Sequence, residues 1–221
     1  ITAAVLMTLS AADALAKKPK KVSKKKKGEV EQVADTTKKA EVKKDKYKET
    51  IKDAKVYDGL IKAYMTPKQE LYFEFKPEHS SHLYLLTNRL TETSDDAAFA
   101  AGQMIGNQIM FRVEMDTSYV HFYNVSTYNR MRPGDEMGEA FYKNHRDPIF
   151  KSFKVAAFKK DTSYLVDMTK FFLSNEKSIT PLQYSSNIMG QKSGSYDAEA
   201  SKILEVKSFP ENVEISTQMN F

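Results

Sequence analysis

The sequence contains no cysteine and no tryptophan among its 221 residues, and it has only four histidines. The lack of cysteine excludes disulfide bonds, thiolate metal ligands, a cysteine nucleophile and a lipid-modified N-terminal cysteine. Only eight glycines and seven prolines are present. The glycines form no phosphate-binding loop of the G-x-x-x-x-G-K-S/T or G-x-G-x-x-G type, and no G-x-S-x-G nucleophile turn. These absences remove the common sequence signatures of nucleotide-binding proteins and of serine or cysteine hydrolases.

Positive charge is concentrated in one part of the chain. Residues 17–55 hold sixteen lysines and seven acidic residues, which gives a net charge of +9. Residues 56–221 hold eighteen basic and twenty-one acidic residues, which gives −3. A nucleic-acid-binding domain carries its basic patch on the folded part. The distribution therefore predicts no nucleic-acid partner.

The first sixteen residues are apolar and end in Ala14-Leu15-Ala16, a small-x-small cleavage pattern. The stretch is too short to cross a bilayer as a stop-transfer helix. We therefore predict a partial signal peptide over residues 1–16, cleavage before Lys17 and no stable membrane span afterwards. The protein would then be exported, and be periplasmic, associated with the outer membrane or extracellular. The alternative interpretation of this stretch is a short buried helix.

Residues 17–46 form a lysine-rich segment with almost no aromatic residues. Such a composition cannot bury enough apolar surface to offset the loss of chain entropy, so we predict a disordered linker. The composition favours a solvated spacer. An electrostatic contact with anionic lipid, polysaccharide or nucleic acid is the alternative.

The strongest strand signal lies between Phe150 and Ile179. Two apolar runs, residues 150–158 and 164–173, flank the polar turn K-K-D-T-S, which is typical of a β-hairpin. Apolar residues occupy both faces of each run, so we expect this hairpin to be covered on both faces and to lie at the centre of a sheet. The run Ile109–Met115 alternates apolar and polar residues instead, which predicts a strand with one face in water.

Other segments complete a predicted α+β fold, dominated by antiparallel β-sheet with a few short helices and preceded by the signal segment and disordered linker. Strands are expected at 71–75, 82–90, 119–128 and 213–221. Short helices are expected around 47–54 and 137–141, the second capped by Asp135, with a helical turn at 197–204 and a long loop at 183–195.

No chemistry-bearing motif is complete in this sequence. His79 and His82 have a spacing that suits a metal, but no third ligand is evident, and two surface histidines are the favoured interpretation. No histidine starts an H-E-x-x-H motif. The aromatic residues between 119 and 128 form either a binding face or, as burial tendencies favour, part of the core. We therefore assign no catalytic, cofactor-binding or metal-binding residue; the aromatic set is Tyr119, Phe122, Tyr123 and Tyr128.

Five stretches, in order, resemble the N-terminal part of a Bacteroidetes family of secreted zinc-dependent metalloproteases with a metzincin-type catalytic domain. They are Gly59–Lys62 with Leu71–Phe75, Leu85–Leu90, Ala101–Phe111, Phe153–Thr169 and Ser208–Ile215. The resemblance implies that residues 47–93 are a small N-terminal domain and residues 94–221 a second, β-rich domain, truncated at its C-terminus. In that family both regions are non-catalytic domains of unknown function. The zinc-binding H-E-x-x-H-x-x-G-x-x-H helix lies further along, so no zinc ligand or catalytic glutamate is carried over to this chain.

The expected function is that of an accessory or pro-region of an exported metalloprotease, inactive alone, which packs on a catalytic domain absent from this chain. Zinc and a protein or peptide substrate would belong to the parent protein. The water-exposed face of Gln108–Asp116 and the final strand Val213–Phe221, an unpaired edge, are expected to meet the missing domain. The alternative is a stand-alone periplasmic or surface module that binds a glycan, lipid or protein through the aromatic hairpin. A stand-alone enzyme would need a catalytic constellation that the sequence does not display.

Overall fold

The structure is a computed structural model, and it describes residues 2–10, 45–94, 100–106, 108–129, 131–132, 134–159, 163–180 and 195–221. The predicted signal peptide lies within the described residues only in part. The predicted linker and the loop at 183–195 lie almost entirely outside them.

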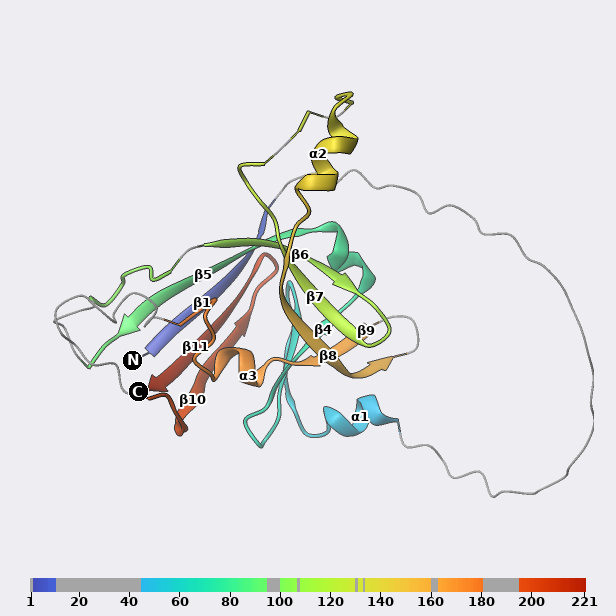
Figure 1. The fold of residues 1–221 in the computed structure, drawn as a ribbon. Helices are drawn as coiled ribbons and strands as arrows, with labels where there is room; N and C mark the ends of the chain where they lie inside the picture. Colours follow the sequence, from blue (N-terminus) through green and yellow to red (C-terminus); the bar gives the residue numbers. More distant parts are fainter. Residues whose placement is uncertain are drawn as a thin grey trace, which may run out of the picture.

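The described strands form an 11-stranded sheet in which every neighbouring pair is antiparallel (Figure 1). Their order is β10-β11-β1-β5-β6-β7-β8-β9-β4-β3-β2. This confirms the predicted fold class. The strands are β1 (Thr2–Ser10), β2 (Lys55–Tyr57), β3 (Lys62–Met65), β4 (Leu71–Phe75), β5 (Leu83–Glu92), β6 (Ile109–Met115), β7 (Tyr119–Asn124), β8 (Ile149–Lys159), β9 (Ser163–Asp167), β10 (Asp197–Ser208) and β11 (Asn212–Asn220).

The helices of the described residues are short and lie outside the sheet. They are α1 (Lys46–Thr50), the 3₁₀ helix η1 (Pro77–Ser81), α2 (Gly138–Asn144) and α3 (Thr169–Phe172). Helix α1 packs beside β8, whereas α2 stands away from the sheet (Figure 1). None of these helices has the length and apolarity that crossing a bilayer requires.

The sheet curves until its two outermost strands approach each other. The backbone N–H of Leu60 donates to the carbonyl of Phe209 at 2.6 Å, and the hydroxyl of Ser208 donates to the carbonyl of Ile61 at 2.8 Å. Gly59 permits this approach, because a Cβ atom there would lie 2.6 Å from backbone atoms of Ser208 and Phe209.

The concave side of the sheet holds a core rich in aromatic rings. Phe111 stacks on Phe122 with ring centres 4.7 Å apart, and Phe122 also meets Phe153 edge-on at 4.9 Å. Tyr84 lies 5.3 Å from Phe111 and continues the stack. Strands β5, β6, β7 and β8 therefore share one aromatic layer, which fixes the direction in which their remaining side chains point.

The hairpin predicted between Phe150 and Ile179 is confirmed in part. Strands β8 and β9 pair with Val155 opposite Val166, and they are the seventh and eighth strands of the sheet. Full cover on both faces was a wrong expectation, because Phe158 is 58 % exposed. The second strand also ends earlier than predicted, since the Asp167 carboxylate accepts the N–H of Thr169 and starts α3.

Two predictions for the C-terminal part are wrong. The segment predicted as a helical turn, residues 197–204, belongs to strand β10, which pairs with β11 and buries Ile203 and Val206. Strand β11 confirms the alternation predicted for residues 213–221. It is not an unpaired edge, however, because it lies between β10 and β1.

Two N-terminal boundaries also differ from the expectation. Asp135 does not cap α2 directly; its carboxylate accepts the N–H of Met137 at 2.9 Å, and the helix begins at Gly138. The backbone of Thr2–Ser10 forms β1, an extended strand between β5 and β11, and not the short helix considered for this stretch. Removal of residues 1–16 as a signal peptide stays a prediction.

The strands of the two predicted domains share the sheet. Strand β4, from residues 47–93, pairs with β9, and β5 from the same unit pairs with β6. The predicted division at residue 94 stays a prediction.

Candidate functional site

The convex side of strands β6, β7 and β8 carries a continuous set of polar and aromatic side chains, called the outer face below. Phe111 and Val113 on β6, and Val120 and Phe122 on β7, are at most 1 % exposed, so their sequence neighbours point away from the core. This confirms the water-exposed face predicted for β6. Cross-strand pairing then places the outward residues side by side. The outer face consists of Arg112, Glu114, Tyr119, His121, Tyr123, Ser152 and Lys154.

Arg112 joins the outer face to the segment that follows α2. Its Nε donates to Oδ2 of Asp147 at 3.2 Å, and its guanidinium also contacts the carboxylate of Glu114. Its Cζ lies 4.1 Å from the ring centre of Tyr123, where a cation–π contact contributes about 0.5–1 kcal/mol at an exposed site. Two carboxylates therefore neutralise Arg112, which leaves its charge poorly placed to attract an anionic ligand.

His121 lies at the centre of a hydrogen-bonded chain on the outer face. Its Nδ1 lies 2.8 Å from the Ser152 hydroxyl, and its Nε2 lies 3.1 Å from Oδ2 of Asp116. The carboxylate of Asp116 also accepts the backbone N–H groups of Ser118 and Tyr119, at 2.6 and 2.7 Å. These two backbone hydrogen bonds, followed by the one from His121, hold the pKa of Asp116 below its usual value of 3.8. The turn thus fixes Asp116, and Asp116 orients the imidazole.

The residue types in this chain are those of a serine hydrolase triad, but the arrangement differs from it. In the triad template the serine contacts Nε2 and a buried aspartate contacts Nδ1. Here the two nitrogens are exchanged, and the Asp116 side chain is 54 % exposed. Catalysis also needs preorganised donors for an oxyanion and exclusion of water, neither of which an open sheet face supplies. The chain therefore orients His121 as a hydrogen-bonding group of the surface.

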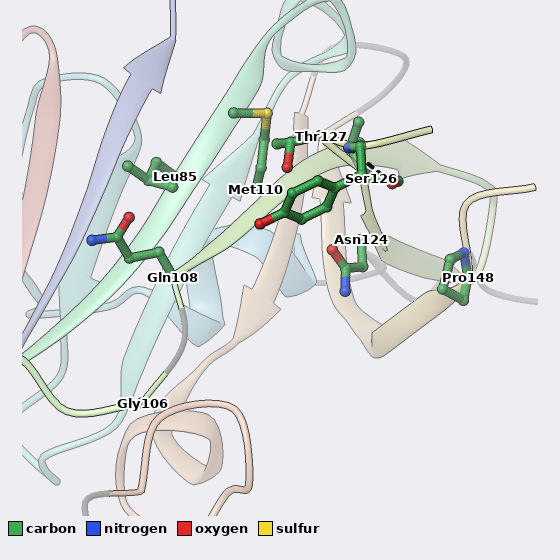
Figure 2. Close-up of a pocket in the computed structure, with 10 residues that line it drawn as sticks. Leu85, Gly106, Gln108, Met110, Asn124, Ser126, Thr127 and Pro148 are labelled. Carbon is green, nitrogen blue, oxygen red and sulfur yellow. Dashed lines mark hydrogen bonds between the residues drawn. The ribbon is translucent and has the colours of Figure 1, made fainter. Parts of the chain in front are cut away.

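A pocket of about 920 Å³ opens at one end of the outer face, where β6 begins and β7 ends (Figure 2). Its volume falls within the range of about 300–1,000 Å³ that is usual for small-molecule sites. The lining includes Gln108, Met110, Asn124, Thr127, Tyr128 and Pro148. We call it the β6–β7 pocket.

The backbone around the β6–β7 pocket is fixed by hydrogen bonds. Asn124 donates its N–H to the carbonyl of Pro148 at 2.9 Å, and Val125 donates to the carbonyl of Met110 at 2.8 Å. The hydroxyl of Ser126 accepts the N–H groups of Tyr128 and Asn129, at 3.3 and 3.1 Å, and so turns the chain after β7. These bonds present the side chain of Tyr128 to solvent, where it is 96 % exposed.

The aromatic residues predicted as either core or binding face divide between the two. Phe122 belongs to the core, whereas Tyr119 and Tyr123 lie on the outer face and Tyr128 lines the pocket. The sequence could not separate them, because β7 ends at Asn124 and not at Tyr128 as expected. The hydrogen-bonded group of Asp116, His121 and Ser152 was missed altogether.

The two histidines with metal-compatible spacing take different roles. His79 is buried and not on the surface as expected; its Nδ1 accepts the N–H of Lys76 at 3.0 Å. Burial lowers the pKa of His79, so the imidazole is neutral. Nδ1 of His82 lies 3.0 Å from the backbone carbonyl oxygen of Glu78. Within the described residues no three metal-ligating side chains converge.

A second group that sequence reasoning missed is buried beneath α1. The hydroxyl of Tyr64 donates to the carboxylate of Glu74 at 2.6 Å, and the hydroxyl of Tyr47 lies 3.4 Å from that of Tyr64. All three side chains are buried. Burial raises the pKa of Glu74, but hydrogen bonds from Tyr64, Ser163 and Tyr47 and the charge of Lys62 outweigh it, so the pKa is lowered overall. This group anchors a helix and is closed to ligands.

Comparison with known proteins assigns the chain to a family. Residues 102–221 match the family model described as "Domain of unknown function (DUF5117)", and the chain belongs to this family. The matched region contains strands β6 to β11, and with them the outer face and most of the β6–β7 pocket. No curated protein and no solved structure matches the chain.

Proposed function

We propose that this chain is the non-catalytic N-terminal accessory region of an exported zinc-dependent metalloprotease, and that it packs against the catalytic domain. The ordered set of five stretches that resembles such proteases supports the assignment. The signal-like residues 1–16 support export. Zinc and the peptide substrate bind to the catalytic domain in this proposal, and the present chain supplies neither a ligand nor a catalytic glutamate.

The observation that carries the proposal is that helix α2 buries none of its side chains in this chain. None of its residues is buried, although Tyr142 within it and Met137 just before it are apolar, and these are 57 % and 63 % exposed. A helix of seven residues is unstable in water without tertiary packing. Packing against a partner would bury these side chains and stabilise the helix.

The outer face and α2 are connected, so a single partner domain would contact both. The ion pair between Arg112 and Asp147 holds the segment after α2 against β6. On β7 and β8, Tyr119 is 41 % and Ile149 46 % exposed, which adds apolar area beside the charged groups. An apolar centre with paired charges at its rim is the usual anatomy of a protein interface.

The test is a binding measurement between this chain and the catalytic domain encoded downstream of it, produced as separate polypeptides. We expect a complex, and we expect a double variant, Met137→Glu with Tyr142→Glu, to weaken it by at least about tenfold. Leu204→Glu is the matched control, because Leu204 is 48 % exposed on β10 and lies outside the proposed interface.

Two outcomes would overturn the proposal. One is a reading frame that continues without an H-E-x-x-H motif. The other is a complex that tolerates the α2 double variant but not Leu204→Glu.

A stand-alone periplasmic or surface binding module is the second candidate. The near-complete exposure of Tyr128 at the β6–β7 pocket favours it. In that case the chain should bind its ligand with no catalytic domain present.

A further inference from the structure

We propose that the β6–β7 pocket binds a neutral saccharide. This inference goes beyond the accessory function and is independent of it, since it concerns a site that this chain builds from its own residues. Three features carry it: the absence of charge among the described lining residues, amide side chains without a hydrogen bond to any described residue, and an exposed aromatic ring.

The described residues that line the pocket are all uncharged. The nearest charged group along the chain is Asp147, next to Pro148, and it is paired with Arg112. The described lining therefore offers an anionic or cationic ligand no free charge to offset its desolvation. The ligand should therefore be neutral.

The polar groups of the lining are available for a ligand. The side-chain amides of Gln108 and Asn124, and the hydroxyl of Thr127, make no hydrogen bond to any residue that the structure describes. Each amide offers donors and an acceptor, and a hydroxyl offers both. Figure 2 shows these side chains projecting from separate parts of the site, at the start of β6 and at the end of β7. Such a set suits a ligand with several hydroxyl groups.

Tyr128 supplies the apolar contact that a sugar ring needs. Its side chain is 96 % exposed, the highest value among the large apolar residues of the described chain, and it borders the same pocket as the amides. A tyrosine ring presents a flat apolar face of large area with few rotatable bonds. The C–H face of a pyranose would pack on this ring while its hydroxyl groups bind Gln108 and Asn124. Met110 and Pro148 extend the apolar part of the lining.

A peptide fits the same location less well. Extended peptides gain affinity by adding a strand to an exposed sheet edge. Both strands at the pocket are internal, because β6 pairs with β5 and β7, and β7 pairs with β6 and β8. The backbone groups that a peptide would need are therefore used within the sheet.

The experiment is titration calorimetry of the full chain with neutral hexasaccharides built from glucose, mannose, xylose or N-acetylglucosamine. Oligogalacturonate and an uncharged hexapeptide serve as comparison ligands. We expect at least one neutral sugar to bind with an affinity that changes little with salt, because no charge is neutralised. Tyr128→Ala should weaken binding by about tenfold or more, and Asn124→Ala or Gln108→Ala by a smaller factor.

Tyr142→Ala is the matched control, since Tyr142 is an exposed aromatic residue on α2 and lies outside the pocket. It should leave sugar affinity unchanged. Because Tyr128 is exposed, its replacement should not alter the fold, which circular dichroism would verify. The proposal is overturned if no neutral sugar binds at concentrations up to about 10 mM, because a dissociation constant above that value means very weak binding. It is equally overturned if only the peptide or oligogalacturonate binds, or if binding survives Tyr128→Ala.

Discussion

Tyr64 on β3 and Glu74 on β4 form a buried hydrogen bond of 2.6 Å, in which the phenol donates to the carboxylate. The phenol of Tyr47 lies 3.4 Å from that of Tyr64 and brings α1 into the same group. A buried carboxylate is stable only if its hydrogen bonds replace those of water. The position of α1 on the sheet is therefore tied to the ionisation state of Glu74.

Replacing Tyr64 by phenylalanine should make the protein more sensitive to acid. The pKa of Glu74 is lower in the folded state than its ordinary value of 4.5, so its stabilisation is present above that pH and is lost as the pH falls. Removing the Tyr64 donor should raise the pKa of Glu74, and acid unfolding should begin at a higher pH. At neutral pH we expect a loss of about 1–3 kcal/mol in the free energy of unfolding.

Urea denaturation between about pH 3 and pH 7 measures both effects. Tyr142→Phe, which removes an exposed phenol on α2, is the control and should change neither quantity. If Tyr64→Phe unfolds in acid at the same pH as the unsubstituted protein, this account of Glu74 is contradicted.

Alkaline pH should unfold the protein through its buried tyrosines. Burial is the largest cause that raises the pKa of Tyr47 and Tyr72 to about 12, and it raises that of Tyr64 and Tyr84 further. An unfolded tyrosine has a pKa of about 10. Stability should thus be complete below pH 10 and fall as the pH rises towards the folded pKa values.

Phenolate absorbance and circular dichroism, followed together, test this expectation. The buried phenols should ionise in step with the loss of structure. Ionisation of all twelve tyrosines without any change in the dichroism spectrum would be the contrary result.

Gly59→Ala should destabilise the contact between the two ends of the sheet. The added Cβ would lie 2.6 Å from backbone atoms of Ser208 and Phe209, which cannot move aside as a flexible side chain can. We expect a cost of about 1–3 kcal/mol in the free energy of unfolding, as for other overpacked sites. Gly138→Ala in α2 is the matched control, because nothing lies within 4 Å of its added Cβ. It should be neutral or stabilise by up to about 1 kcal/mol.

Ser152 should not react as a hydrolase nucleophile. Its hydroxyl contacts Nδ1 of His121 on the outer face, where Ser152 is exposed to water and His121 is half-buried. A fluorophosphonate probe, which labels activated serines, should leave the chain unmodified. Labelling that disappears in Ser152→Ala and also in His121→Ala would show an active nucleophile and contradict our interpretation.

If the protein is exported with cleavage of its signal peptide, strand β1 should be absent from the mature chain. If residues 1–16 are a signal peptide, the mature chain begins at Lys17 and cannot contain β1. We expect N-terminal sequencing of exported protein to give Lys17 as the first residue. Recovery of exported protein that retains residues 2–10 would instead favour β1 as a permanent strand.

Much of the fold could be predicted because the pattern of burial follows the sequence closely in places. In β11, Val213, Ile215 and Met219 are buried while their neighbours are half-buried, and this two-residue period is visible in the sequence. Strand β10 could not be predicted in the same way. Its first half contains Ala, Glu and Lys, which favour helices, and pairing with β11 overrides that preference.

The candidate sites were harder to predict because they depend on strand register. His121 and Ser152 are 31 positions apart and meet only because β7 and β8 pair with these two residues opposite each other. Tyr64 and Glu74 meet as diagonal neighbours across β3 and β4, because the register places Tyr64 opposite Tyr72 and Glu74 opposite Lys62. A single-residue slip would turn each side chain to the other face. The composition of the sequence and the spacing of residues within one strand do not indicate which register two strands adopt.

The pairing of β4 with β9 and of β5 with β6 has a consequence for how the molecule is assembled. A polypeptide limited to the family-matched residues 102–221 would keep β6, β9 and β11 but lose their neighbours β5, β4 and β1. Three strand edges would then be open to intermolecular pairing, so such a fragment should self-associate. During synthesis, β4 cannot pair with β9 until about ninety more residues have been made. Because such long-range pairing slows folding, we expect the full chain to fold slowly.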